Sequence, residues 1–225
     1  MSTLFSYCVL YDNGAAPNPF WNTCTLAICK PAIRRNAQVG DWIIGTGSKR
    51  YDFENHMIYA MKVTEIMLFE AYDQYCKEKL PKKIPDVNSK DMRRVFGDCI
   101  YDFSRKGLPT KRAGVHTIAD RKKDLSGLHV LLSKHFYYFG SEPIPLPNHL
   151  LKIVRQGQGH KSRLNEPYIN GFVKWLSQFD HLKNKVVAMP YGLQNMTLEE
   201  CRSMCNKEKL EVINHQKSRK RKSCI

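Results

Sequence analysis

The stretch of residues 39–65 constrains the fold most, because it predicts two neighbouring buried strands joined by a loop. A Gly-Asp turn signal precedes the short apolar run of residues 42–45, and residues 57–63 form a second apolar run. Both runs are rich in side chains that favour strands, and a polar stretch separates them. A chain with such a pair is organised around a sheet.

The loop between these strands has the composition of an anion-binding turn. Gly45, Gly47 and Ser48 allow close backbone approach, because glycine has no Cβ. Lys49 and Arg50 place positive charge at the same point. A nucleotide or another anion held at a strand end accounts for this pattern, and so does an ordinary hairpin whose loop is polar because it faces water.

The overall charge indicates a polyanionic partner. The 225 residues carry a formal net charge of +15, and the pI is about 9.5. Residues 217–222 hold five of the basic side chains, so the rest of the chain is basic in its own right. Phosphate contacts made by lysine and arginine usually dominate affinity for nucleic acid. We therefore expect a nucleic-acid or nucleotide partner, with a basic protein that lacks such a partner as the alternative.

Length and patterning predict one domain over residues 1–214 and a basic tail over residues 215–225. No apolar run approaches the roughly 18 residues of a membrane span, and the first residues do not resemble a secretory signal. The eight cysteines include no CxxC pair, so we expect reduced, buried thiols in a cytoplasmic protein without membrane association. No Cys/His spacing predicts a metal site, and no motif predicts a cofactor.

Apolar runs and capping signals predict further elements. Residues 69–80 have aromatic side chains at helical spacing, and Thr197 with Glu200 forms a capping box that begins a helix over residues 198–212. Residues 104–124 are basic and poor in apolar side chains, which predicts a long surface loop with a solvent-exposed His116. The remaining expected elements are strands at residues 4–11, 23–29, 97–103 and 128–132, and a helix at residues 165–179.

Two further stretches have features of a binding site. Residues 136–139 are four consecutive aromatics, and because side chains in a strand alternate faces, two of them must point to a partner, a ligand or a covering loop. Residues 155–163 combine Gly157 and Gly159 with basic side chains. This stretch resembles a phosphate-contacting loop, although the spacing of a P-loop is absent.

A series of longer motifs resembles one protein family. The chain contains, in this order, DNGAAPNPFW, CTLAICKPAIRRNAQVGDWIIGTGS, MIYAMKVTE, GDCIYDF, VLLSKHFYYFG and GQGHKS. Together these motifs resemble the nucleotide modification associated domain 2 family of bacteria and bacteriophages. The resemblance implies a link to modified nucleotides or nucleic acids and assigns no reaction. It implies site roles at Asp12, Asn13, Asn18, Lys30, Arg34, Gly45, Thr46, Gly47, Ser48, Asp98, Tyr101, Ser133 and His160.

A second resemblance concerns the fold alone. The turn, apolar strand and Gly/Ser loop, followed by a strand that ends in Val-Thr-Glu, are similar to PUA-like barrels such as ASCH and EVE domains. That resemblance implies a small mixed sheet and nucleic-acid binding. We expect an α+β fold with one domain, in which peripheral helices surround a mixed sheet. A PUA-like barrel is one form that this sheet can take.

The first functional interpretation is a module that binds nucleic acid or nucleotide. A pocket of Trp21, Trp42, Tyr101 and Tyr138 would accept a base, with stacking worth about 1–3 kcal/mol per base. Amide and hydroxyl groups would read the edge of the base, and basic side chains would contact phosphates. The expected binding residues are Asn13, Asn18, Trp21, Lys30, Arg34, Trp42, Thr46, Ser48, Lys49, Arg50, Tyr101, Ser133, Tyr138 and Lys161.

The second interpretation is an enzyme that acts on a nucleotide or base by acid–base chemistry. Its catalytic groups would be Asp12, Asp98 and His160, provided that they converge in one pocket. Cys24 or Cys29 as a nucleophile is a further option, although a cysteine in a strand more often belongs to the core. A structural or interaction protein is the third interpretation.

Overall fold

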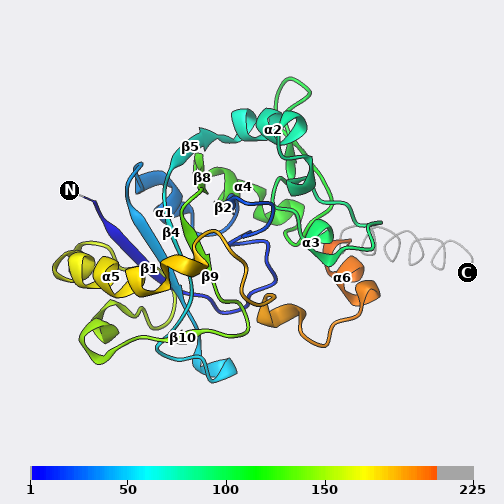
Figure 1. Cartoon of the computed structure of the whole chain (residues 1–225). Coiled ribbons are helices and arrows are strands. Elements are labelled where there is room, and N and C mark those ends of the chain that lie inside the picture. Colours follow the sequence, from blue (N-terminus) through cyan, green and yellow to red (C-terminus); the bar gives the residue numbers. More distant parts are fainter. Residues whose placement is uncertain (1, 207–225) are drawn as a thin grey trace, which may run out of the picture.

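The computed structural model describes residues 2–206, which form an α+β fold (Figure 1). The strands are β1 (Leu4–Cys8), β2 (Cys24–Leu26), β3 (Trp42–Thr46), β4 (His56–Lys62), β5 (Glu65–Leu68), β6 (Tyr101–Asp102), β7 (Thr110–Lys111), β8 (His129–Ser133), β9 (Phe136–Tyr138) and β10 (Ile144–Pro145). The α-helices are α1 (Pro31–Asn36), α2 (Phe69–Glu78), α3 (Met92–Val95), α4 (Arg121–Leu125), α5 (Ile169–Leu176) and α6 (Leu198–Cys205). Short 3-10 turns are η1 (Lys49–Tyr51), η2 (Pro81–Lys83), η3 (Ile118–Asp120), η4 (Asn148–Ile153), η5 (Arg163–Tyr168), η6 (Ser177–Leu182) and η7 (Tyr191–Leu193). The expected fold class is confirmed.

The largest sheet has five strands and mixed pairing. Its order is β1-β3-β4-β10, and β9 also pairs with β4. β1 and β3 are parallel, whereas β3, β9 and β10 are antiparallel to β4. The strands predicted at residues 42–45 and 57–63 are therefore confirmed as β3 and β4, which are neighbours within this sheet.

Two smaller antiparallel sheets complete the strand pairing. β8 lies between β2 and β5 in a three-stranded sheet, and β6 pairs with β7 in a short hairpin. The mixed sheet expected from the sequence is present. It does not close into a barrel with the other strands of residues 2–206, so the PUA-like barrel is not the form that this sheet takes.

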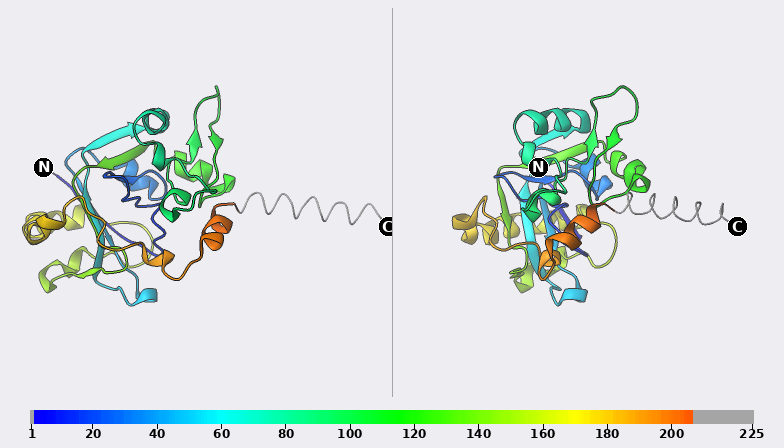
Figure 2. Two further views of the ribbon diagram at one scale, coloured as in Figure 1. Left: turned by 45° about the vertical axis from the view of Figure 1, so that its right-hand side comes forward. Right: turned by 90° about the vertical axis from the view of Figure 1, so that its right-hand side faces the viewer.

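Three apolar cores separate the layers of the fold. On one face of the five-stranded sheet, Phe172 of α5 packs with Trp42 of β3. The other face meets the three-stranded sheet, where Ile43 and Leu131 belong to one core. Val130 and its neighbours on the far side of the three-stranded sheet are covered by α2, α3 and α6. Figures 1 and 2 show α5 on one side of the sheets and α2 and α6 on the other.

The layering explains the four consecutive aromatics. Phe136 and Tyr138 point into the core between the two sheets, and Tyr137 and Phe139 point into the core beneath α5. All four are at most 1% exposed. Of the alternatives that the sequence left open, a covering element is therefore the one present, since Phe179 of η6 lies 5.7 Å from Phe139 between ring centroids.

Gly45, within β3, and Gly47, just after it, leave room for other parts of the protein itself. A Cβ built on Gly45 would lie 2.4 Å from the ring of Tyr59, and one built on Gly47 would lie 2.3 Å from Phe53 Cβ. Close approach at these positions is real, as the sequence predicted. The approaching groups are the ring of Tyr59 in β4 at Gly45, and Cβ and the backbone of Phe53 at Gly47.

The helix predictions hold at residues 69–80, which contain α2, and at Thr197, whose capping box with Glu200 begins α6. The part of the predicted last helix beyond residue 206 and the basic tail lie outside the described residues. Residues 104–124 differ from the single surface loop that we expected, because they contain β7, η3 and α4. Within residues 2–206, no helix combines the length and apolar character needed to cross a membrane.

Candidate functional site

Four chain segments that are far apart in the sequence meet around one cavity of about 520 Å³. They are residues 7–11 after and within β1, residues 29–33 at the start of α1, residues 116–123 from His116 to α4, and residues 157–160. Cavities of this size are typical of small-molecule sites. The cavity is therefore the first place to look for function.

The edge of β1 brings the segment of residues 157–160 to the cavity. Backbone hydrogen bonds of 2.9 Å join Ser6 and Lys161 in both directions, which extends the open edge of β1 by one bridge. Gly157 and Gly159 have φ angles of 75° and 90°, which side chains rarely allow, and they fold the chain back before His160. The predicted phosphate-contacting loop thus lines the cavity.

The turn between β2 and α1 presents Cys29 to the same cavity. Cys29 and Lys30 have φ angles of 59° and 40°, in the left-handed region. Two successive non-glycine residues in this region carry strain of about 1–3 kcal/mol each, and such strain concentrates at functional sites. A strand that leads through a strained turn into a helix is also the arrangement of the nucleophile in several hydrolases.

Cys29 belongs to a cysteine–histidine–aspartate cluster. Its Sγ lies 3.3 Å from Nε2 of His116, and Nδ1 of the same imidazole lies 2.6 Å from Oδ2 of Asp124. The side chain of His116 is 20% exposed and that of Asp124 only 1%. A thiol, an imidazole and a carboxylate stand in the order that covalent catalysis uses in other proteins.

Several further hydrogen bonds fix Asp124. Its Oδ1 accepts the backbone N–H of Cys29 at 3.2 Å, and its Oδ2 accepts the Tyr101 hydroxyl at 2.8 Å. Its backbone carbonyl accepts Nη2 of the buried Arg34 at 2.6 Å, and Arg34 also donates from Nε to the carbonyl of Cys29 at 2.7 Å. The carboxylate thus has little freedom to leave the histidine.

The electrostatic surroundings keep His116 protonated. Burial acts to lower the pKa of His116, but the hydrogen bonds with Asp124 and Cys29 outweigh burial and raise the pKa from 6.5 to about 10. An imidazolium at neutral pH donates from both ring nitrogens. A cationic imidazole beside a sulfur is the environment in which cysteine reacts as a nucleophile.

Both polar and apolar side chains line the cavity. Lys30, Lys123, His160 and Asp120 are among the polar ones, and Val9 and Leu10 contribute apolar surface. Burial lowers the pKa of Lys30, and the neighbouring thiols Cys29 and Cys8 act in the opposite direction. Burial, with help from Arg155 and Lys30, lowers the pKa of His160, which leaves that imidazole neutral at neutral pH.

The three expected catalytic groups do not meet in this cavity. His160 lines it, but Asp12 and Asp98 are fully buried elsewhere. Asp12 accepts hydrogen bonds from the Tyr138 hydroxyl and from the backbone N–H of Gly14. Burial raises the pKa of Asp12 to about 6, although both hydrogen bonds act to lower it.

Asp98 belongs to a buried polar network. Its carboxylate accepts hydrogen bonds from Thr25 and Tyr72. Beside it, the fully buried Lys83 donates to the backbone and side-chain oxygens of Asn18 and to Thr23 and Thr25 at 2.7–2.9 Å. Burial raises the pKa of Asp98 and lowers that of Lys83, and the attraction between the two charges opposes both shifts. Asn18 and Asp98 therefore hold the segment before β2 in place.

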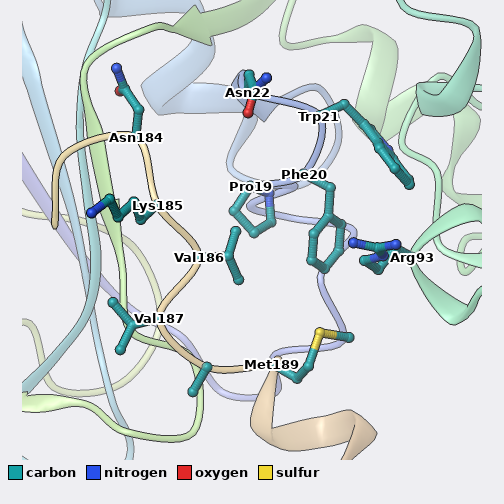
Figure 3. A pocket seen from close by; sticks show the side chains of 11 residues that line it. Pro19, Phe20, Trp21, Asn22, Arg93, Asn184, Lys185, Val186, Val187 and Met189 are labelled. Atoms are coloured by element: carbon teal, nitrogen blue, oxygen red, sulfur yellow. The ribbon is translucent and has the colours of Figure 1, made fainter.

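The four aromatics of the expected base pocket also lie apart. Trp42 packs edge-to-face on Phe172 in a core, and Tyr138 is buried against Asp12. Tyr101 stands behind the cluster as a donor to Asp124. Trp21 lines a different cavity, shown in Figure 3, where Arg93 lies 4.9 Å from the centroid of its ring.

The remaining expected binding residues have varied surroundings. Lys30 lines the cavity and Arg34 anchors Asp124, as described above. Lys49 is exposed and pairs with Glu54 at 3.4 Å, and Arg50 lies over the ring of Tyr51. Hydrogen bonds within the protein hold four others, which are Asn13, Thr46, Ser133 and Lys161, and Ser48 is buried.

Sequence reasoning missed two members of the cluster. The expectation of a solvent-exposed His116 is wrong, because β7, η3 and α4 fold its segment against the cavity. Asp124 had been assigned only to the end of a loop. Two signals in the sequence were available, and neither is specific. One is the break at Lys30-Pro31 directly after Cys29, and the other is a histidine eight residues before an aspartate. In the described part of the chain, no group of three or more His, Cys, Asp or Glu side chains has the arrangement of a metal site.

The fold and the cavity define an α+β protein with a thiol–imidazole–carboxylate cluster beside a cavity that two lysines help to line. The chain belongs to the family described as nucleotide modification associated domain 2, whose profile matches residues 1–197. Its role is therefore related to nucleotides and their modification. No curated protein and no solved structure matches the chain.

Proposed function

We propose that this protein binds a nucleotide, either free or within a polynucleotide, in the cavity lined by residues 7–11, 29–33 and 157–160 and by His116, Asp120 and Lys123. The observation that carries the proposal is the convergence of a glycine loop and two lysines with an apolar wall around one cavity of about 520 Å³. A nucleotide requires both kinds of surface, because its phosphate is anionic and its base is largely apolar on its faces. Membership of a nucleotide-modification family supports the same substrate class.

The phosphate would lie at the basic side of the cavity. Lys30 and Lys123 supply positive charge there, and the Gly157–Gly159 loop offers backbone groups without side chains in the way. A phosphate gains most from donors that are already positioned, since their ordering has been completed on folding. Two contacts position the ammonium of Lys30. It donates to the Cys8 carbonyl at 3.4 Å, and it lies 4.3 Å from the Tyr7 ring centroid.

The base would lie towards Leu10 and Tyr11. Both line the cavity and remain 55% and 40% exposed, which leaves apolar surface for a ligand to cover. The Tyr11 ring is fixed, because its hydroxyl donates to the Gly192 carbonyl at 2.7 Å. A fixed aromatic ring at a rim is suited to stacking on any base.

The same rim offers a path for a polynucleotide. The ring of Tyr51 lies 6.5 Å from that of Tyr11, and the guanidinium of Arg50 lies over Tyr51 at 5.6 Å. The predicted basic turn thus continues from the cavity rim. A strand whose nucleotide occupies the cavity would pass Arg50 and the exposed Lys49.

Fluorescence anisotropy tests the proposal. The protein is titrated against fluorescent nucleoside monophosphates and against single- and double-stranded DNA and RNA, each with plain and modified bases. Lys123→Gln should weaken nucleotide binding about tenfold, because it removes a charge-assisted phosphate contact. Lys122→Gln is the matched control: Lys122 also lies on α4 and is exposed, but it does not line the cavity. Equal effects of the two substitutions, or no binding to any of these ligands, would refute the proposal.

A second pair of variants separates free nucleotide from polynucleotide. Lys49→Glu combined with Arg50→Glu should weaken polynucleotide binding and lower its salt dependence, and it should leave mononucleotide binding unchanged. The chain without residues 215–225 shows how much of the affinity comes from the tail. Binding that disappears with the tail would place the polyanion site outside the cavity.

A further inference from the structure

We propose that Cys29 is the nucleophile of an acyl-transfer reaction in this cavity, with His116 as its acid–base partner and Asp124 as the residue that positions His116. The identity of the substrate as an acylated nucleotide rests on the proposed function. The thiol chemistry does not, because it follows from the cluster itself. Catalysis of this kind extends the proposed function from binding to covalent modification.

The position of Cys29 distinguishes it from the other described thiols. It is partly exposed and lines the cavity, whereas Cys8, Cys24, Cys76, Cys99, Cys201 and Cys205 are buried. Cys8 also borders the cavity, but its thiol donates to the Gly47 carbonyl at 3.7 Å. Cys29 instead has a histidine nitrogen at 3.3 Å, so it combines access for a ligand with an imidazole partner.

The cluster is fixed from several directions before any substrate binds. Asp124 receives the Cys29 backbone N–H and the Tyr101 hydroxyl, so it links the nucleophile turn to the histidine segment. The histidine segment is held in turn by the capping box of Thr117 and Asp120 that begins η3. Pre-positioned groups of this kind reduce the reorganisation that a reaction requires.

The surroundings also place a cationic ring beside the sulfur. Burial lowers the pKa of His116, but Asp124 and Cys29 raise it further than burial lowers it, to about 10. The cationic ring can therefore stabilise a thiolate and donate a proton to a leaving group. The groups that act on it electrostatically or contact it are Cys29, Asp124 and Asp120.

The reaction is balanced without any group that the site lacks. The Cys29 sulfur attacks the carbonyl carbon of an ester or amide, and the π pair moves to oxygen. When that pair returns, the bond to the leaving oxygen or nitrogen breaks, and the leaving group takes the proton from His116 Nε2. A thioester on Cys29 and neutral His116 remain. Water then attacks the thioester and gives a proton to His116, and collapse releases a carboxylic acid and the thiolate.

The cavity lies beside the cluster, which supports a substrate whose acyl group is attached to a nucleotide. Lys30 follows Cys29 directly and lines the same cavity, and Lys123 precedes Asp124. A phosphate bound by the two lysines would hold the rest of the ligand beside the sulfur. Remote binding of this type raises the effective concentration of the reacting carbonyl.

Thiol reactivity tests the proposal independently of nucleotide binding. The full chain carrying Cys224→Ser, which removes a cysteine outside the described residues, is treated with iodoacetamide at pH 6. Cys29 should be the first cysteine to be alkylated. Its rate with His116 present should be at least roughly ten times its rate in the His116→Gln variant, because a neighbouring imidazolium stabilises a thiolate. His149→Gln, at an exposed histidine remote from the cluster in sequence, should leave the rate unchanged.

A chemical substrate then tests acyl transfer. With p-nitrophenyl acetate, the protein should release a stoichiometric burst of p-nitrophenolate and carry one acetyl group on Cys29, detected by mass spectrometry of the peptide. Cys29→Ser and His116→Gln should each abolish the burst. Circular dichroism and mononucleotide binding of both variants show whether the fold and the cavity persist.

The two proposals fail in different ways. Alkylation of Cys29 at the rate of glutathione, or a burst that persists in Cys29→Ser, would overturn the nucleophile even if nucleotides bind. Rapid alkylation and an acetyl-Cys29 burst in a protein that binds no nucleotide would retain the nucleophile and overturn the proposed ligand class.

Discussion

The buried carboxylate of Asp12 makes the stability of this protein depend on pH in a direction opposite to that of most aspartates. Asp12 is 0% exposed, and burial raises its pKa from 3.8 to about 6. The folded state therefore binds the proton of Asp12 more tightly than the unfolded state does. The free energy of unfolding falls as pH rises from about 4 to about 6, and this contribution is constant at higher pH.

The magnitude follows from the two pKa values. The difference between 3.8 and about 6 corresponds to roughly 3 kcal/mol of stability that is present at low pH and absent at neutral pH. Asp12→Asn keeps an oxygen that accepts a hydrogen bond and removes the charge. We therefore expect the variant to gain about 3 kcal/mol relative to the natural chain between pH 3.5 and pH 7.

Urea unfolding of both proteins at intervals across this pH range measures the difference. Because the other carboxylates are common to both chains, their titration cancels in the comparison. A difference that is independent of pH, or one that moves in favour of the natural chain as pH rises, would refute the reasoning and would mean that Asp12 is ionised at low cost.

Two other predictions concern the cations of Lys83 and His116, each of which lies within a polar network. Lys83→Met should destabilise the fold by about 3–5 kcal/mol, because it leaves the oxygens around the ammonium without their donor and removes the attraction between Lys83 and Asp98. The exposed Lys79→Met should change the free energy of unfolding by less than about 0.5 kcal/mol. Comparable losses in the two urea titrations would contradict the network. The pKa of His116 is raised from 6.5 to about 10, so this residue contributes stability that is complete below pH 6.5 and is lost as pH rises to about 10. The free energy of unfolding of the natural chain should therefore exceed that of His116→Gln by a margin that shrinks by a few kcal/mol over this interval. A margin that stays constant with pH would argue against the charged pair.

The sheets were more predictable than the site. β3, β4 and β8 coincide with short, strongly apolar runs, whose pattern reports burial directly. The capping box of Thr197 was equally predictable, because capping depends on residues a few positions apart. Signals of this kind are local, so they do not depend on which distant residues come into contact.

The cavity depends on contacts that no local pattern contains. Cys29 meets His116 across 87 positions and Asp124 across 95, so the sequence offers the candidate groups without their pairing. Gly45 and Gly47 indicated close approach correctly, but the approaching groups are the ring of Tyr59 from the adjacent strand and Phe53. Of the expected site residues, Lys30 and His160 reach the cavity because their loops fold onto the end of β1.

The long sequence separations within the cluster also set the time at which it can form during synthesis. Cys29 leaves the ribosome as an ordinary unpaired thiol, since its histidine and carboxylate partners lie 87 and 95 residues further along the chain. Loop closure over such distances follows the formation of local structure. The pairing of Cys29 with His116 and Asp124 is therefore a late event in folding. Alkylation of Cys29 in nascent chains of increasing length would report when this part of the protein reaches its native arrangement.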